Sequence, residues 1–76
     1  MKTMYTYRII LNHEPEGGYT VIVPSLPGCI TYGNDIEHAK DMAKEAIEGY
    51  IGLLKDQGEE IPDDSHSLEY SLTLSS

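Results

Sequence analysis

The chain has 76 residues, of which 13 are acidic and 5 are basic, so its formal net charge is −8 at pH 7. This length predicts one domain, residues 1–76, with a limited core. The negative charge would repel a phosphate backbone, so we expect no direct binding of nucleic acid. It would attract a basic protein, although it also has a simpler interpretation, solubility alone.

The first part of the chain predicts three antiparallel strands. Alternating side chains indicate a strand over residues 4–11, whose apolar face would carry Tyr5, Tyr7, Ile9 and Leu11. Pro15 and the Gly17-Gly18 pair predict a hairpin connection to a second strand over residues 19–23, which ends at Pro24. A turn over residues 25–28 leads to a short third strand at about residues 29–32.

The second part predicts a helix and a fourth strand. Asp35 is a good N-cap for an amphipathic helix that ends at Gly58. Apolar residues alternate again near the C-terminus, at Leu68, Tyr70, Leu72 and Leu74. The predicted class is therefore α+β with the element order β-β-β-α-β. The crossover to the fourth strand should be right-handed. If the fourth strand pairs beside the first in parallel, the sheet order is 3-2-1-4 with one helix on one face. The other face is expected to be polar enough to meet solvent or a partner, with Thr6, Arg8, Thr20, Ser71 and Thr73.

Residues that carry catalysis are present, but they do not form a known constellation. Asp63 and Asp64 are adjacent in a loop, where neighbouring carboxylates rarely converge on one metal ion. The three histidines have no metal-ligand spacing among themselves or with Cys29. We therefore expect no catalytic residue, no metal and no cofactor, and we keep a ribonuclease-H-like hydrolase as the less favoured alternative.

The location of the protein is predicted from two simple features. No apolar run approaches the roughly 18 residues that a membrane span needs, so no membrane association is expected. The single cysteine, Cys29, suits a reducing compartment, which predicts a cytoplasmic protein.

The segment from Gly17 to Gly33, which reads GGYTVIVPSLPGCITYG, combines a Gly-Gly-Tyr start with a Pro-x-Leu-Pro-Gly-Cys turn. With the helix that follows, it resembles the HicB family of antitoxins over roughly residues 5–62. The resemblance implies a partial ribonuclease-H-like fold that lacks the nuclease carboxylates. It also implies a partner, HicA, a small basic toxin that cleaves RNA with the help of a histidine.

The resemblance also has a limit at the C-terminus. Many members of the family carry an additional C-terminal DNA-binding domain, whereas this sequence stops at Ser76, directly after the predicted fourth strand. We therefore expect no operator binding by this chain alone. An antitoxin without its own DNA-binding domain is one interpretation, and a solitary HicB-like oligomer that binds another protein or ligand is the other.

Residues 56–69 hold six acidic side chains and no lysine or arginine. Such a loop could occupy the phosphate-binding surface of a toxin, or it could simply be solvated. The candidate partner-binding residues are Leu26, Glu59, Glu60, Asp63 and Asp64. Leu26 would be an apolar anchor at the tip of a rigid turn, with packing over the helix end as the alternative. The free edge of the fourth strand predicts a homodimer or a higher oligomer.

Overall fold

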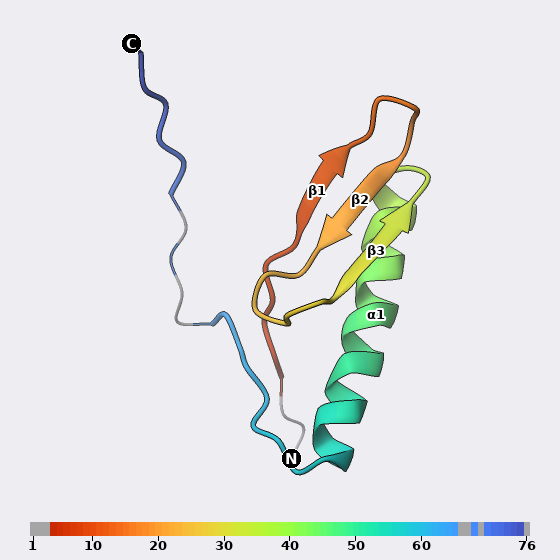
Figure 1. The fold of residues 1–76 in the computed structure, drawn as a ribbon, viewed down its shortest axis with the longest axis vertical. Helices are drawn as coiled ribbons and strands as arrows, with labels where there is room; N and C mark the ends of the chain where they lie inside the picture. The colour runs from red at the N-terminus through yellow and green to blue at the C-terminus, as the bar shows by residue number, and fades with distance from the viewer. Residues whose placement is uncertain (1–3, 66–67, 69, 76) are drawn as a thin grey trace.

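The computed structural model describes residues 4–65, 68 and 70–75. Strands β1 (Ile10–His13), β2 (Tyr19–Ile22) and β3 (Ile30–Gly33) form an antiparallel sheet in the order β1-β2-β3, and helix α1 (Ile36–Asp56) packs against one face of it (Figure 1). The α+β class and the relative order of the first three strands are therefore confirmed. In the part of the chain that is described, no helix is long and apolar enough to cross a membrane.

The β1–β2 hairpin depends on a tight connection over residues 14–18. The amide of Gly17 donates to the carbonyl of Glu14 at 2.9 Å, and the amide of Glu14 donates to the carbonyl of Gly18 at 3.0 Å. Gly17 has φ 104°, which glycine adopts without the steric cost that a Cβ would bring. The connection fixes the register, which pairs His13 with Tyr19.

Strand β1 begins at Ile10, six residues later than the sequence predicts. Pro24 follows the end of β2 and has no amide to donate, so the residues before Ile10 lack a ladder partner on that side. Their backbone is instead bonded to the loop after α1, because the amide of Asp64 donates to the carbonyl of Thr6 at 2.8 Å. The N-terminal stretch is therefore extended but is not part of the three-stranded sheet.

Both ends of α1 have the predicted caps. The amide of His38 donates to Oδ1 of Asp35 at 2.8 Å, which satisfies one of the free amides of the first turn. At the other end, Gly58 has φ 70° and donates to the carbonyl of Lys55 at 3.1 Å, and Glu59 donates to that of Leu54 at 2.9 Å. These two bonds form a Schellman motif, which ends the helix and fixes where the next residues start.

The core lies between α1 and the sheet, in two adjoining clusters. Val21 packs against Ala39 and Ala43, and beside them lie Val23, Leu26 and Cys29. The contact at the start of α1 is close, because a Cβ on Gly33 would lie 2.3 Å from the backbone of Ala39. Small residues on both elements therefore let the helix approach β3 directly.

None of the described residues of the predicted fourth strand forms a strand. Residue 68 and residues 70–75 have no regular secondary structure and run beyond the outer edge of β1, while residue 69 lies outside the described part (Figure 1). The side chains of Leu72 and Leu74 are 86% and 89% exposed, so they gain no contact that would hold them on the edge of the sheet. The 3-2-1-4 order is thus found only for its first three strands.

The outer face of the strands that are formed is polar in part, because Thr20 lies there opposite Asn12, but it also carries large apolar side chains. The register pairs Ile10 with Ile22 and Ile22 with Ile30, so three isoleucines form one row across the sheet. Directly opposite residues in antiparallel strands point to the same face, and α1 covers the other one. Ile30 is 62% exposed, which makes this row an apolar surface in contact with solvent.

Candidate protein-binding surface

The predicted acidic loop, residues 59–65, begins directly after the cap of α1. Glu59 and Glu60 are both exposed, and they follow the Schellman motif, in which the amide of Glu59 donates to the carbonyl of Leu54. A helix carries a partial negative charge at its C-terminus, so the two carboxylates add to a potential that is already negative. This end of the molecule would therefore attract a cationic surface.

The other two acidic candidates face inward. Asp64 is 8% exposed, and its Oδ2 accepts a bond of 2.8 Å from the amide of Arg8, while its Oδ1 accepts one from the hydroxyl of Ser25. Asp63 is half-buried, and its Oδ2 accepts a bond of 2.9 Å from the amide of Thr6. These carboxylates hold the loop on the N-terminal stretch, so their structural role is evident, whereas toxin contact by any of the four stays a prediction.

The same network sets the charge state of its members. The backbone amide of Arg8 and then the hydroxyl of Ser25 lower the pKa of the Asp64 carboxyl, and they outweigh the opposite effect of burial. Burial and then the charge of Asp63 raise the pKa of the Tyr7 hydroxyl. That hydroxyl is protonated and donates to the carbonyl of Pro62 at 2.5 Å. The loop is thus bonded along residues 62–64.

Leu26 is not an exposed anchor, because its side chain is fully buried. The turn that carries it folds back on itself, with the amide of Leu26 donating to the carbonyl of Val23 and the amide of Cys29 donating to that of Leu26. Leu26 packs with Val23 and Cys29, and residues of α1 such as Tyr50 and Leu54 pack against this cluster. Of its two predicted roles, the structure shows the packing role.

The isoleucine row is a surface that the sequence analysis missed. Ile10 is apolar where the alternation of the first strand calls for a polar residue, and this is the one signal of the row in the sequence. Only the register could show that Ile10 has Ile22 and Ile30 beside it on the same face. Tyr32 extends this surface and is 46% exposed, and its hydroxyl donates to the carbonyl of Gly17 at 2.9 Å.

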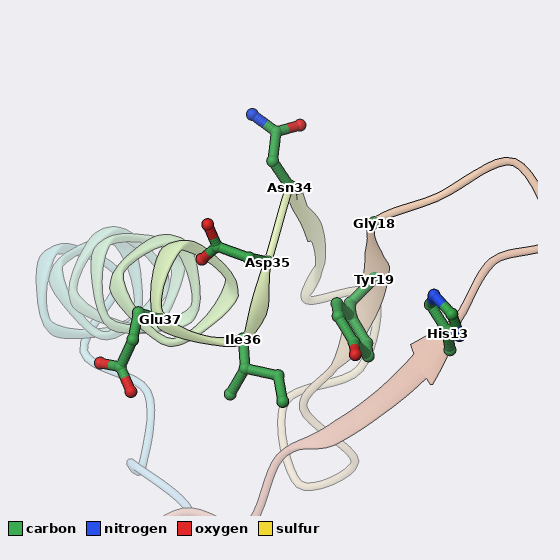
Figure 2. A pocket seen from close by; sticks show the side chains of 7 residues that line it. All are labelled: His13, Gly18, Tyr19, Asn34, Asp35, Ile36 and Glu37. Atoms are coloured by element: carbon green, nitrogen blue, oxygen red, sulfur yellow. The ribbon is translucent and has the colours of Figure 1, made fainter.

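A shallow hollow of about 550 Å³ lies where the hairpin meets the start of α1 (Figure 2). Figure 2 shows the rings of His13 and Tyr19 side by side, with the side chain of Asn34 pointing away from them. The two carboxylates of the hollow already have partners, since Asp35 caps the helix and Glu37 lies 3.4 Å from the ammonium group of Lys40. We therefore interpret this hollow as a consequence of how the start of α1 meets the hairpin, and not as a ligand site.

A second hollow, the lateral groove, has a volume of about 360 Å³ and lies between the N-terminal stretch and α1. Tyr5, Tyr7 and Ile9 form one wall, and Ala43 and Ile47 form the other. Charged residues of the helix complete the lining, namely Lys40, Lys44 and Glu48. The groove is mainly apolar. It lies next to the acidic loop, because Tyr7 lines the groove and its hydroxyl donates to the carbonyl of Pro62 in that loop. Its composition fits a protein segment better than a charged small molecule.

Comparison with known proteins places the chain among a group of short, widely distributed proteins. It is 44% identical over 59 residues to a UPF0150 protein of Thermoplasma acidophilum, covering 78% of this chain and 86% of the relative. It is 38% identical over 61 residues to a UPF0150 protein of Synechocystis sp., covering 80% of this chain and 77% of the relative. A UPF0150 protein of Archaeoglobus fulgidus is 39% identical over 49 residues, or 64% and 71% of the two chains.

The family match is more informative about function. The model that describes the HicB-like antitoxin of bacterial toxin–antitoxin systems matches residues 7–74. That range includes the turn around Leu26, the whole of α1 and the acidic loop, so the match extends over most of the structure described above. The chain belongs to the HicB-like antitoxin family.

Proposed function

We propose that this protein neutralises a HicA-like, RNA-cleaving toxin by covering the basic surface with which that toxin holds RNA. The observation that supports this most directly is the placement of Glu59 and Glu60, exposed at the negative end of α1. A toxin that binds RNA must present positively charged side chains to the phosphates. In the complex those side chains would pair with the carboxylates of Glu59 and Glu60 instead. The role is binding and not catalysis.

The four acidic residues of the loop have two different roles. Glu59 and Glu60 contact the partner, while Asp63 and Asp64 hold the loop in place through their bonds to the amides of Thr6 and Arg8. A loop bonded at both ends loses little conformational freedom on binding, which favours affinity. The apolar row of Ile10, Ile22 and Ile30 gives the partner a second, uncharged surface to cover.

Three further expectations belong to the same proposal, namely the completed sheet, self-association and a cytoplasmic location. The C-terminal segment completes a partial ribonuclease-H-like sheet in the order 3-2-1-4, and it does so in a homodimer or higher homo-oligomer. The edge of β1, which has no strand beside it among the described residues, is where this completion takes place. The cytoplasmic location expected from the single cysteine stays a prediction.

The test is binding to a basic, HicA-like protein, sought first among short reading frames beside the gene for this chain, and it is measured by isothermal titration calorimetry. The double variant Glu59→Lys/Glu60→Lys should weaken binding by at least about tenfold, because like charges would then face each other. The control is Glu16→Lys/Glu45→Lys, two exposed residues on other parts of the molecule. Each double variant adds four charges, from −8 to −4, so only the position of the change differs.

Two results would separate the competing explanations. Equal loss of affinity in both double variants would mean that net charge acts and that the loop is not the contact surface. The absence of any binding by the wild-type chain would favour the alternative, a solitary HicB-like oligomer with a different partner or ligand.

A further inference from the structure

The C-terminal tail, residues 68 and 70–75, exposes a row of large apolar side chains. Their exposed fractions are 80% for Leu68, 81% for Tyr70, 86% for Leu72 and 89% for Leu74, so none is covered by its own chain. In Figure 1 the tail runs along the outer side of β1 and away from the sheet. An apolar row of this size is seldom left in water, so the tail requires a surface that covers it.

The lateral groove has the composition and the spacing that such a tail needs. Tyr5, Tyr7 and Ile9 recur every second residue along one wall, as Leu72 and Leu74 do in the tail. A tail of eight residues would measure roughly 26 Å when extended, and the stretch from residue 5 to residue 13 measures roughly 30 Å. The tail is therefore short enough to lie along this stretch. The long aliphatic stems of Lys40 and Lys44 at the groove can also cover apolar side chains while their charges stay in water.

The tail is directed away from the groove of its own chain. The contact between the loop after α1 and the N-terminal stretch starts like a parallel ladder, since the amide of Asp64 donates to the carbonyl of Thr6. The next amide, that of Arg8, is taken by the side chain of Asp64 and not by the backbone of the tail. The amide of Ser65 turns back to Oδ1 of Asp63 at 2.5 Å. These bonds interrupt the ladder at the point where the tail would have to continue along its own edge.

We infer that two copies of this chain exchange their tails, each tail lying along residues 5–13 of the other copy with its apolar side chains in the lateral groove. One two-fold axis makes the two contacts identical and leaves neither groove nor tail uncovered. Added backbone bonds would complete the free edge of β1 with a strand from the partner. The inference rests on the self-association proposed above, and it does not depend on the toxin.

The first experiment measures the mass of the full chain by size-exclusion chromatography with light scattering. Exchange predicts a dimer of 2 × 8.5 = 17 kDa for the wild type at micromolar concentration. Leu72→Asp should weaken the dimer by at least about 100-fold, because it would bury a carboxylate in the groove. Thr73→Asp is the matched control, with the same charge on the opposite face of the tail, and should stay dimeric. Both sites are exposed in the single chain, so neither change disturbs its fold.

The second experiment identifies the chain that each tail contacts. Isotope-labelled and unlabelled chains are unfolded, mixed and refolded, and an isotope-filtered NOE spectrum is recorded. Exchange predicts contacts between the Leu72 and Leu74 methyl groups of one chain and the Tyr5 and Tyr7 rings of the other. A monomer would overturn both self-association and exchange, whereas a dimer with these contacts only within one chain, or without them, would overturn exchange alone. A tail that becomes ordered only with the toxin would overturn it as well.

Discussion

The carboxylate of Asp64 accepts a hydrogen bond of 2.8 Å from the backbone amide of Arg8, which lies 56 residues earlier in the chain. This bond joins the loop after α1 to the stretch before β1. The bond from the hydroxyl of Ser25 joins the same loop to the turn after β2. These two bonds also determine which acidic residues of the loop are buried and which are exposed. Asp64 is committed to the fold, and Glu59 and Glu60 remain exposed to solvent.

Asp64→Ala should lower the free energy of unfolding by about 1–3 kcal/mol, because the amide of Arg8 and the hydroxyl of Ser25 would both lose their acceptor. Urea denaturation followed by circular dichroism measures the change. Glu60→Ala removes an exposed acidic side chain of the same loop and should stay within about 0.5 kcal/mol of the wild type. Equal effects of the two changes would show that the Asp64 network does not stabilise the fold.

Acid should destabilise the wild type through the same group. The folded protein lowers the pKa of Asp64, so the ionised form stabilises the fold at pH values above the ordinary aspartate pKa of about 3.9. This contribution is lost as the pH falls from there through the lowered pKa of the folded state. Chemical denaturation at a series of pH values should therefore show a shallower loss for Asp64→Asn than for the wild type. Parallel curves would contradict the assignment.

Gly33→Ala should destabilise the protein by about 1–3 kcal/mol, because its Cβ would lie 2.3 Å from the backbone of Ala39 and the start of α1 would have to move. Gly49→Ala is the matched control within α1. A Cβ at Gly49 meets nothing within 4 Å, so alanine should stabilise the helix by about 0.5–1 kcal/mol. Thermal unfolding of the two variants should move in opposite directions, and a shift of the same sign would refute the close approach of α1 to β3.

Cys29 should be unreactive in the folded protein. Its side chain is 6% exposed, and burial raises the pKa of its thiol, which reduces the fraction of reactive thiolate. Labelling with a thiol-specific reagent should be at least about 100-fold slower than in the denatured chain, in line with a small domain stabilised by about 3–5 kcal/mol. Rapid labelling without denaturant would mean that the turn around Leu26 opens readily.

Local chemistry made some elements predictable from the sequence. Asp35 and Gly58 marked the ends of α1, and Gly17 marked the hairpin, because each has a backbone preference that acts within a few residues. The burial of Leu26 and the role of Asp64 could not be predicted in the same way. Both depend on contacts with segments far away in the chain, and an acidic loop looks alike whether its carboxylates bond to backbone amides or to water.

The fate of the last predicted strand has a similar cause. Alternation at Leu72 and Leu74 correctly indicates a segment with one apolar face, but it does not say which surface covers that face. In the single chain the segment is exposed, because the bonds of Asp64 and Ser65 direct it away from the lateral groove of its own chain. The isoleucine row at Ile10 was likewise hidden until the register aligned three separate residues.

The most direct test of the central claim is the RNA-cleaving activity of a HicA-like protein that binds this chain, measured with increasing amounts of the purified wild-type protein. Neutralisation predicts that cleavage falls to background near one chain per toxin and returns when Glu59 and Glu60 are both changed to lysine. Undiminished cleavage at a large excess of a folded wild-type chain would contradict it.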